Sequence, residues 1–154
     1  TGSGTLSLLY DDDAHTMLIN ATFAGLSGTT STAHIHCCTA TPSAGTAGVA
    51  LATGGILPGF QLGVQSGTYT QLIDLSLTTN YGAAFVTASG GTAAGAESAL
   101  INALTTQTAY FNIHSTTFAG GEIRAFVTAV PEPGTWALMA LGLVAVGLAK
   151  RRSA

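Results

Sequence analysis

The sequence predicts an all-β fold, an antiparallel sandwich or barrel with one short helix, followed by a separate apolar C-terminal helix. Short segments rich in β-branched and aromatic residues recur through the first 129 residues, and glycine-rich connections separate them. From residue 130 the composition changes to a Pro-Glu-Pro element and an uncharged apolar run. These observations divide the chain into a β domain at residues 1–129 and a tail at residues 130–154.

A hairpin is predicted at the N-terminal end of the β domain. Residues 5–10 and 16–23 are strand-like, and Asp11, Asp12 and Asp13 lie between them. The three aspartates lack the glycine and the distant glutamate of an EF-hand loop, so we interpret them as a solvated turn rather than a calcium site.

Further strands follow with Gly-rich loops between them. Residues 45–67 contain many glycines and Pro58, which predicts mostly loop. Residues 93–104 have apolar residues at helical spacing and are predicted to form the one helix of the domain. Strands after the hairpin are expected at residues 32–37, 69–77, 108–114 and 122–128, with short ones near Val49 and Phe60.

The charge pattern excludes one class of partner. Charged residues make up 7% of the chain, and before Val130 the only basic residue is Arg124, against six acidic residues. Nucleic-acid binding needs a basic surface, so we expect no nucleic-acid partner. So few charges also leave little repulsion between copies, which favours self-association.

The tail has the order of a membrane-sorting signal. Helix formation must begin after Pro131 and Pro133, because proline lacks a backbone N–H and disfavours helix in the residue before it. The uncharged run at residues 135–149 would give about 22 Å of helix at ~1.5 Å per residue, short of the ~30 Å bilayer core. The basic residues that follow it place the C-terminus on the cytoplasmic side and the β domain outside.

This tail resembles the PEP-CTERM sorting signal of Gram-negative bacteria. The resemblance implies recognition by an exosortase-type enzyme, a transient stay in the inner membrane, cleavage near the Pro-Glu-Pro element, and delivery to the cell surface or extracellular matrix. An ordinary single-span anchor is the alternative. If the tail is retained, its small residues predict a homo-oligomer or filament through the C-terminal helix. The residues that carry the motif are Val130, Pro131, Glu132, Pro133, Lys150, Arg151 and Arg152.

Histidine supplies the chemistry of the β domain. Side chains alternate along a strand, so His34 and His36 share one face, and Asn112 and His114 share a face of a later strand. Three imidazoles from two neighbouring strands would make a site for copper or, less favoured, zinc. Glu122 and Asn112 are expected to lie behind the ligands and to orient them through hydrogen bonds. A hydrogen-bonded polar cluster without metal is the alternative.

The fourth histidine is expected to lie apart from this site. His15 follows the three aspartates of the predicted turn, so we interpret it as a surface residue. A metal bridge between subunits is its alternative role.

The β domain resembles the CHRD domain, named for chordin. The resemblance rests on Ala-His-Ile-His at residues 33–36, a Ser-Gly-Gly-Thr segment before an alanine-rich helix, Asn-Ile-His at residues 112–114 and Gly-Glu-Ile-Arg at residues 121–124. It implies an immunoglobulin-like barrel distantly similar to copper/zinc superoxide dismutase, in which a His-x-His strand and a later histidine hold copper. It supplies no activity.

Cys37 and Cys38 depart from the family pattern, in which a Gly-Pro pair is more usual. Three states are open for them. They could form a vicinal disulfide, they could stay free or pair between molecules, or Cys38, on the face of His34 and His36, could join a soft-metal site as a thiolate.

Two functional classes follow from the sequence. The first is a secreted structural or adhesive protein of the cell surface or matrix, without enzymatic activity, in which copper has a rigidifying or sequestering role. The alternative is an extracellular copper enzyme of the superoxide-dismutase type. The absence of zinc-site ligands and of basic residues that would steer an anion argues against the enzyme.

Overall fold

The computed structural model describes residues 2–130. The predicted C-terminal helix and the motif residues after Val130 lie outside the described residues. Within residues 2–130, no helix is long and apolar enough to span a membrane.

One antiparallel sheet contains the predicted hairpin. Strands β1 (Ser3–Asp11) and β2 (Thr16–Ala24) pair along their whole length, and β5 (Gly67–Asp74) pairs with the other edge of β2. Between β1 and β2, the carboxylate of Asp11 accepts a hydrogen bond from the Ala14 N–H at 2.9 Å. The hairpin and its aspartate turn are therefore confirmed.

A second antiparallel sheet has the order β4-β3-β6-β7. Its strands are β3 (Thr30–His36), β4 (Val49–Leu51), β6 (Tyr110–Ser115) and β7 (Ile123–Phe126). The strand expected near Phe60 is wrong. This ring lies in a loop and packs into the core, where it stacks on Phe23 at 5.7 Å between ring centroids.

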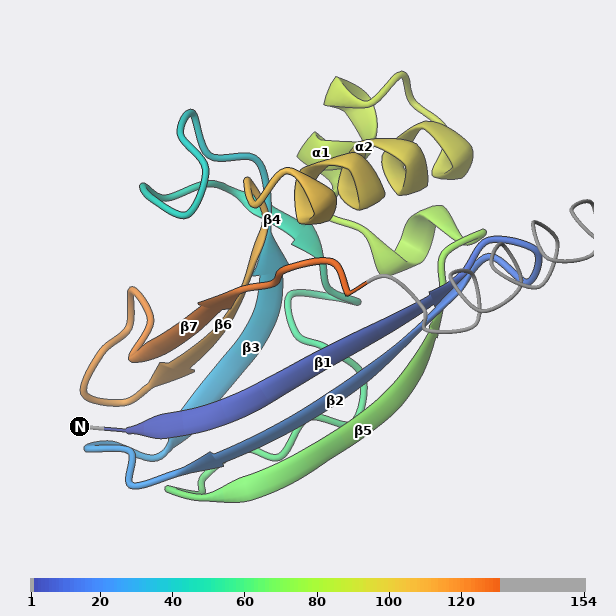
Figure 1. The fold of residues 1–154 in the computed structure, drawn as a ribbon. Coiled ribbons are helices and arrows are strands. Elements are labelled where there is room, and N and C mark those ends of the chain that lie inside the picture. The colour runs from blue at the N-terminus through green and yellow to red at the C-terminus, as the bar shows by residue number, and fades with distance from the viewer. Residues whose placement is uncertain (1, 131–154) are drawn as a thin grey trace, which may run out of the picture.

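Side chains from both sheets form one core. Met17 and Ile19 of β2 are fully buried, as are Ala33 and Ile35 of β3, and all four belong to one apolar cluster with Ile113. The two sheets therefore pack face to face, as Figure 1 shows. Side chains alternate along a strand, so the residues of β3 and β6 that lie between these core residues, such as His34 and His114, are on the opposite face, directed away from the other sheet.

Helical segments gather at one end of the domain. The predicted helix is present as α2 (Ala93–Thr105), which begins at Thr92, whose hydroxyl accepts the Gly95 N–H at 3.1 Å. No element was predicted for residues 78–88, which form the 3-10 helix η1 (Thr78–Asn80) and the short helix α1 (Ala83–Ala88). Figure 1 shows α1 and α2 together on the side of β4.

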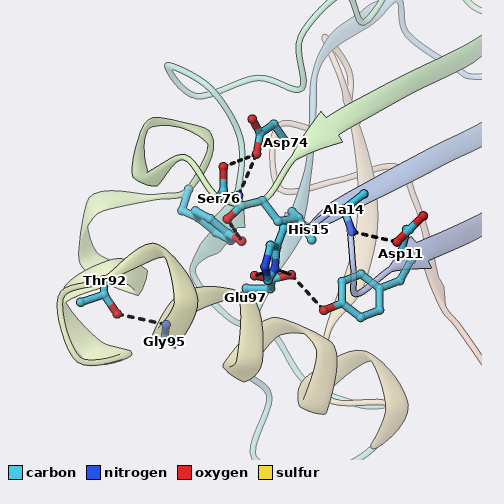
Figure 2. Close-up of polar contacts among 11 residues, drawn as sticks. Asp11, Ala14, His15, Asp74, Ser76, Thr92, Gly95 and Glu97 are labelled. Atoms are coloured by element: carbon cyan, nitrogen blue, oxygen red, sulfur yellow. Dashed lines mark hydrogen bonds and ion pairs between the residues drawn. The ribbon is translucent and has the colours of Figure 1, made fainter.

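A polar contact joins α2 to the hairpin. The Glu97 side chain, only 7% exposed, accepts a hydrogen bond from the Tyr10 hydroxyl at 2.9 Å and pairs with His15 Nδ1 at 3.0 Å. Figure 2 shows His15 against Glu97 above the helix. The His15 side chain is 55% exposed, so its predicted surface position is correct. Its partner in the described structure is a carboxylate of its own chain.

Candidate metal centre

The structure brings His34, His36 and His114 together. Each offers one ring nitrogen, and these nitrogens lie within 4.8 Å of one another. The register explains the convergence, because His34 lies opposite Asn112 and His114 lies opposite Thr32, which makes His34 and His114 diagonal neighbours on one face of the β3–β6 ladder. Ring centroids of this pair are 4.7 Å apart.

Loops bury the cluster on the outer face of the sheet. The three imidazoles are 7–8% exposed, although they point away from the apolar core. The carbonyl of Ala47, in the loop before β4, accepts from His36 Nδ1 at 2.9 Å. The carbonyl of Ala119, in the loop between β6 and β7, accepts from His114 Nδ1 at 2.7 Å. Two loops distant in sequence therefore cover and orient two of the rings.

These contacts fix the tautomers. A carbonyl oxygen only accepts, so His36 and His114 carry their protons on Nδ1 and direct the lone pair of Nε2 inward. The hydroxyl of Thr32 donates to the Gly55 carbonyl at 3.0 Å, so it accepts from Nε2 of His34 at 3.1 Å. His34 therefore directs the lone pair of Nδ1 inward.

Three lone pairs thus face one another. His34 Nδ1 lies 3.2 Å from His36 Nε2, and His36 Nε2 lies 3.4 Å from His114 Nε2. Nitrogens bound at ~2.0–2.1 Å to a tetrahedral ion lie about 3.3–3.4 Å apart. The cluster therefore has the donor type of a three-nitrogen metal site, and two of its three nitrogen pairs have the required spacing, while all three nitrogens lie within 4.8 Å of one another. The distal N–H groups are held as metal-binding histidines require.

The inward nitrogens of His34 and His36 are not readily protonated. Burial, together with the neighbouring imidazoles of His114 and His36, lowers the pKa of His34 from 6.5 to about 4. Burial also lowers the pKa of His36. At neutral pH these two rings are therefore neutral, which is the state that binds a metal ion.

Asn112 lies beside the cluster, but its amide contacts the nitrogen of His114 that faces the other two rings, rather than the distal N–H that a supporting residue would hold. Its Nδ2 is 3.2 Å from His114 Nε2 and 3.4 Å from the Gly120 carbonyl. Gly121 has a φ of +115°, and a Cβ at this position would collide with the Asn112 amide. The glycine turn between β6 and β7 is thus shaped to admit Asn112.

The expected role of Glu122 is wrong. Its carboxylate accepts the backbone N–H groups of Ser27 and Gly28, and the imidazole hydrogen bonds described above go to other partners. The side chain joins the β6–β7 loop to the β2–β3 loop. The alternation of side chains along a strand could not predict this contact, because Glu122 precedes β7 and lies in a loop.

Cys37 and Cys38 form a disulfide with each other. Of the three states that the sequence left open, the structure has the vicinal one. A cysteine in a disulfide has no thiolate to offer a metal, so Cys38 is not among the converging donors.

An aromatic and cationic layer covers His36 on one side. The Tyr110 ring stacks on the His36 ring at 4.9 Å between centroids, and the Arg124 guanidinium lies 5.3 Å from the Tyr110 ring centre. Arg124 also donates to the Gly45 carbonyl at 2.6 Å, which ties down the loop that carries Ala47. The roles of Thr32 and of the two loop carbonyls had no signal in the sequence beyond the position of Thr32 on the same strand face as His34 and His36.

The fold and the site define an all-β domain of two antiparallel sheets with a buried three-histidine cluster. The model of the CHRD domain family matches residues 1–127, and the chain belongs to this family. The model of the PEP-CTERM protein-sorting motif matches residues 129–152. Comparisons with curated proteins and with solved structures gave no significant match.

These two matches establish the cellular route in outline. The sorting motif indicates an exported, cell-surface-associated protein of a Gram-negative bacterium that is processed by an exosortase-type enzyme. The family match gives no activity.

Proposed function

We propose that the protein is a secreted, non-enzymatic component of the cell surface or extracellular matrix whose CHRD domain holds one copper ion through His34, His36 and His114. The observation that carries the proposal is the convergence of three lone pairs whose distal N–H groups are fixed by Ala47, Ala119 and Thr32. Copper would stabilise the domain or be sequestered by it.

Copper is favoured over calcium and magnesium because the donors are neutral imidazoles. Hard divalent ions prefer carboxylate and carbonyl oxygens, whereas imidazole suits copper and zinc, and copper binds more tightly than zinc to a given nitrogen site. Zinc is the second choice.

A holding role is favoured over turnover because the cluster is buried. Loops leave the three ligands 7–8% exposed, so little surface is available to a substrate. The alternative is an immunoglobulin-like, superoxide-dismutase-type enzyme. Superoxide consumption by the copper-loaded protein, lost in the triple histidine variant, would favour that alternative.

We further propose that residues 1–129 form the functional domain and that residues 130–154 serve delivery. Exosortase cleavage near Pro133 would release the domain to the surface. Retention of the tail would instead allow oligomers or filaments through the apolar residues 135–149.

Copper uptake tests the main proposal. We expect one copper per chain for the wild type, less for His36→Ala and none for a variant with all three histidines replaced by alanine. His15→Ala is the matched control, because His15 is the remaining histidine of the chain and lies apart from the cluster. Equal copper content in the wild type and the triple variant would refute the site.

A further inference from the structure

Strand β1 forms a long edge of its sheet. It pairs with β2 over nine residues without a register shift, and the sheet order places it at the end. Within residues 2–130, no strand pairs with its other side. The outward backbone N–H and C=O groups of β1 therefore form a row that can pair with another strand.

This edge lacks the features by which proteins block such pairing. Between Ser3 and Tyr10 it has no charged residue and no proline, and its ladder with β2 contains no bulge. The edges of the other sheet differ, because β4 has three residues and β7 has four and carries Arg124. The opposite edge of the same sheet, β5 (Gly67–Asp74), is also long and is uncharged up to Ile73, so β1 is distinguished from it by the apolar opening described next.

An apolar opening runs beside β1. Two hollows of about 440 and 700 Å³ lie between this strand and β7, and Leu6 is part of the lining of both. Leu6 and Leu8 are only half-buried there, although they point toward the core. Figure 1 shows β1 and β7 as neighbouring strands of the two sheets. A strand added to β1 would cover these leucines as well as pair with its backbone.

We propose that β1 is a self-association edge, along which two copies of this chain pair antiparallel, β1 against β1. The second copy offers an edge of equal length, and charge supports the pairing, because the strand is uncharged from Ser3 to Tyr10 and no like charges oppose one another along it. A twofold axis makes the contact self-complementary and joins two three-stranded sheets into one continuous sheet. The proposal does not depend on copper.

Cysteine cross-linking on cells tests the pairing with the full chain. Thr5, Ser7 and Leu9 are exposed on the outer face of β1, and each is replaced singly by cysteine. Directly opposite residues of antiparallel strands have Cβ atoms ~4.5–5.5 Å apart, close to the spacing of a disulfide. Thr70→Cys is the matched control, because Thr70 lies in the same cross-strand row as Ser7 but on β5, at the opposite edge.

After mild oxidation with diamide, non-reducing gels should show a covalent dimer for the β1 position nearest the twofold axis and at least a ten-fold weaker band for Thr70→Cys. Absence of a dimer at all three β1 positions would overturn the proposal. Dimer bands of equal strength at β1 and at Thr70 would overturn it too, because they would indicate random collision, contact through the sheet face or pairing through β5.

A charge substitution provides the second readout. Full overlap of two Ser3–Asp11 strands puts the central residue, Ser7, at the axis. Ser7→Lys then opposes two ammonium groups there and should weaken dimerisation at least ten-fold, whereas Thr70→Lys should leave it unchanged. Chemical cross-linking of the exported protein measures both variants. Equal dimer fractions for Ser7→Lys and the wild type would contradict pairing through β1.

Discussion

Acid should destabilise the metal-free domain through His34. In the folded protein the pKa of this imidazole is about 4, because burial and the two neighbouring rings disfavour its charge, whereas the unfolded chain has the ordinary value of 6.5. Between these values the unfolded state binds a proton that the folded state does not. The free energy of unfolding is therefore constant above pH 6.5 and falls as the pH decreases toward 4.

The magnitude follows from the two pKa values. Lowering the pH from 7 to 5 should cost roughly 2 kcal/mol, or roughly 1 kcal/mol if solvent screens the cluster in part. His36 adds in the same direction, because burial lowers its pKa as well. Most carboxylates titrate below this window, at about pH 4.

Urea unfolding of the chain ending at Val130 measures the effect. His34→Gln keeps a hydrogen-bond donor for Thr32 but removes the titrating ring. Between pH 7 and 5 this variant should therefore lose about half as much stability as the wild type, or less. His15→Gln, at the exposed histidine, serves as the control. If His34→Gln loses as much stability as the wild type over this window, the reasoning is refuted.

Two further predictions concern the glycine turn and the tail. Gly121→Ala places a Cβ against Asn112 at a positive φ and should destabilise the domain by about 1–3 kcal/mol in urea unfolding, while Gly120→Ala, whose Cβ would meet no atom within 4 Å, should change stability little. Equal effects of the two would contradict the close fit at Asn112. Intact-mass measurement on protein from the cell surface should give a chain ending near Pro133, and a full-length mass there would contradict cleavage.

Sequence periodicity predicted the parts of the fold that depend on local pattern. Alternation placed His34 and His36 on one face of their strand, and Asn112 and His114 on one face of a later strand. Helical spacing identified α2. Phe60 was assigned to a strand because an aromatic residue in an apolar stretch has the same pattern whether it lies in a strand or fills the core from a loop.

The sequence could not predict which groups surround the histidine cluster. The carbonyls of Ala47 and Ala119 act through the backbone, so their residue types carry no signal for hydrogen bonding to imidazoles. Glu122 was expected to orient an imidazole, but the path of the β6–β7 loop directs it toward Ser27.

The central claim is that one metal ion binds between the three inward nitrogens. Diffraction from copper-loaded crystals, recorded on both sides of the copper absorption edge, tests it most directly. The account predicts a single anomalous peak about 2.0–2.1 Å from His34 Nδ1, His36 Nε2 and His114 Nε2. A peak beside His15 and Glu97, or no peak at the three histidines of a crystal grown with excess copper, would contradict it.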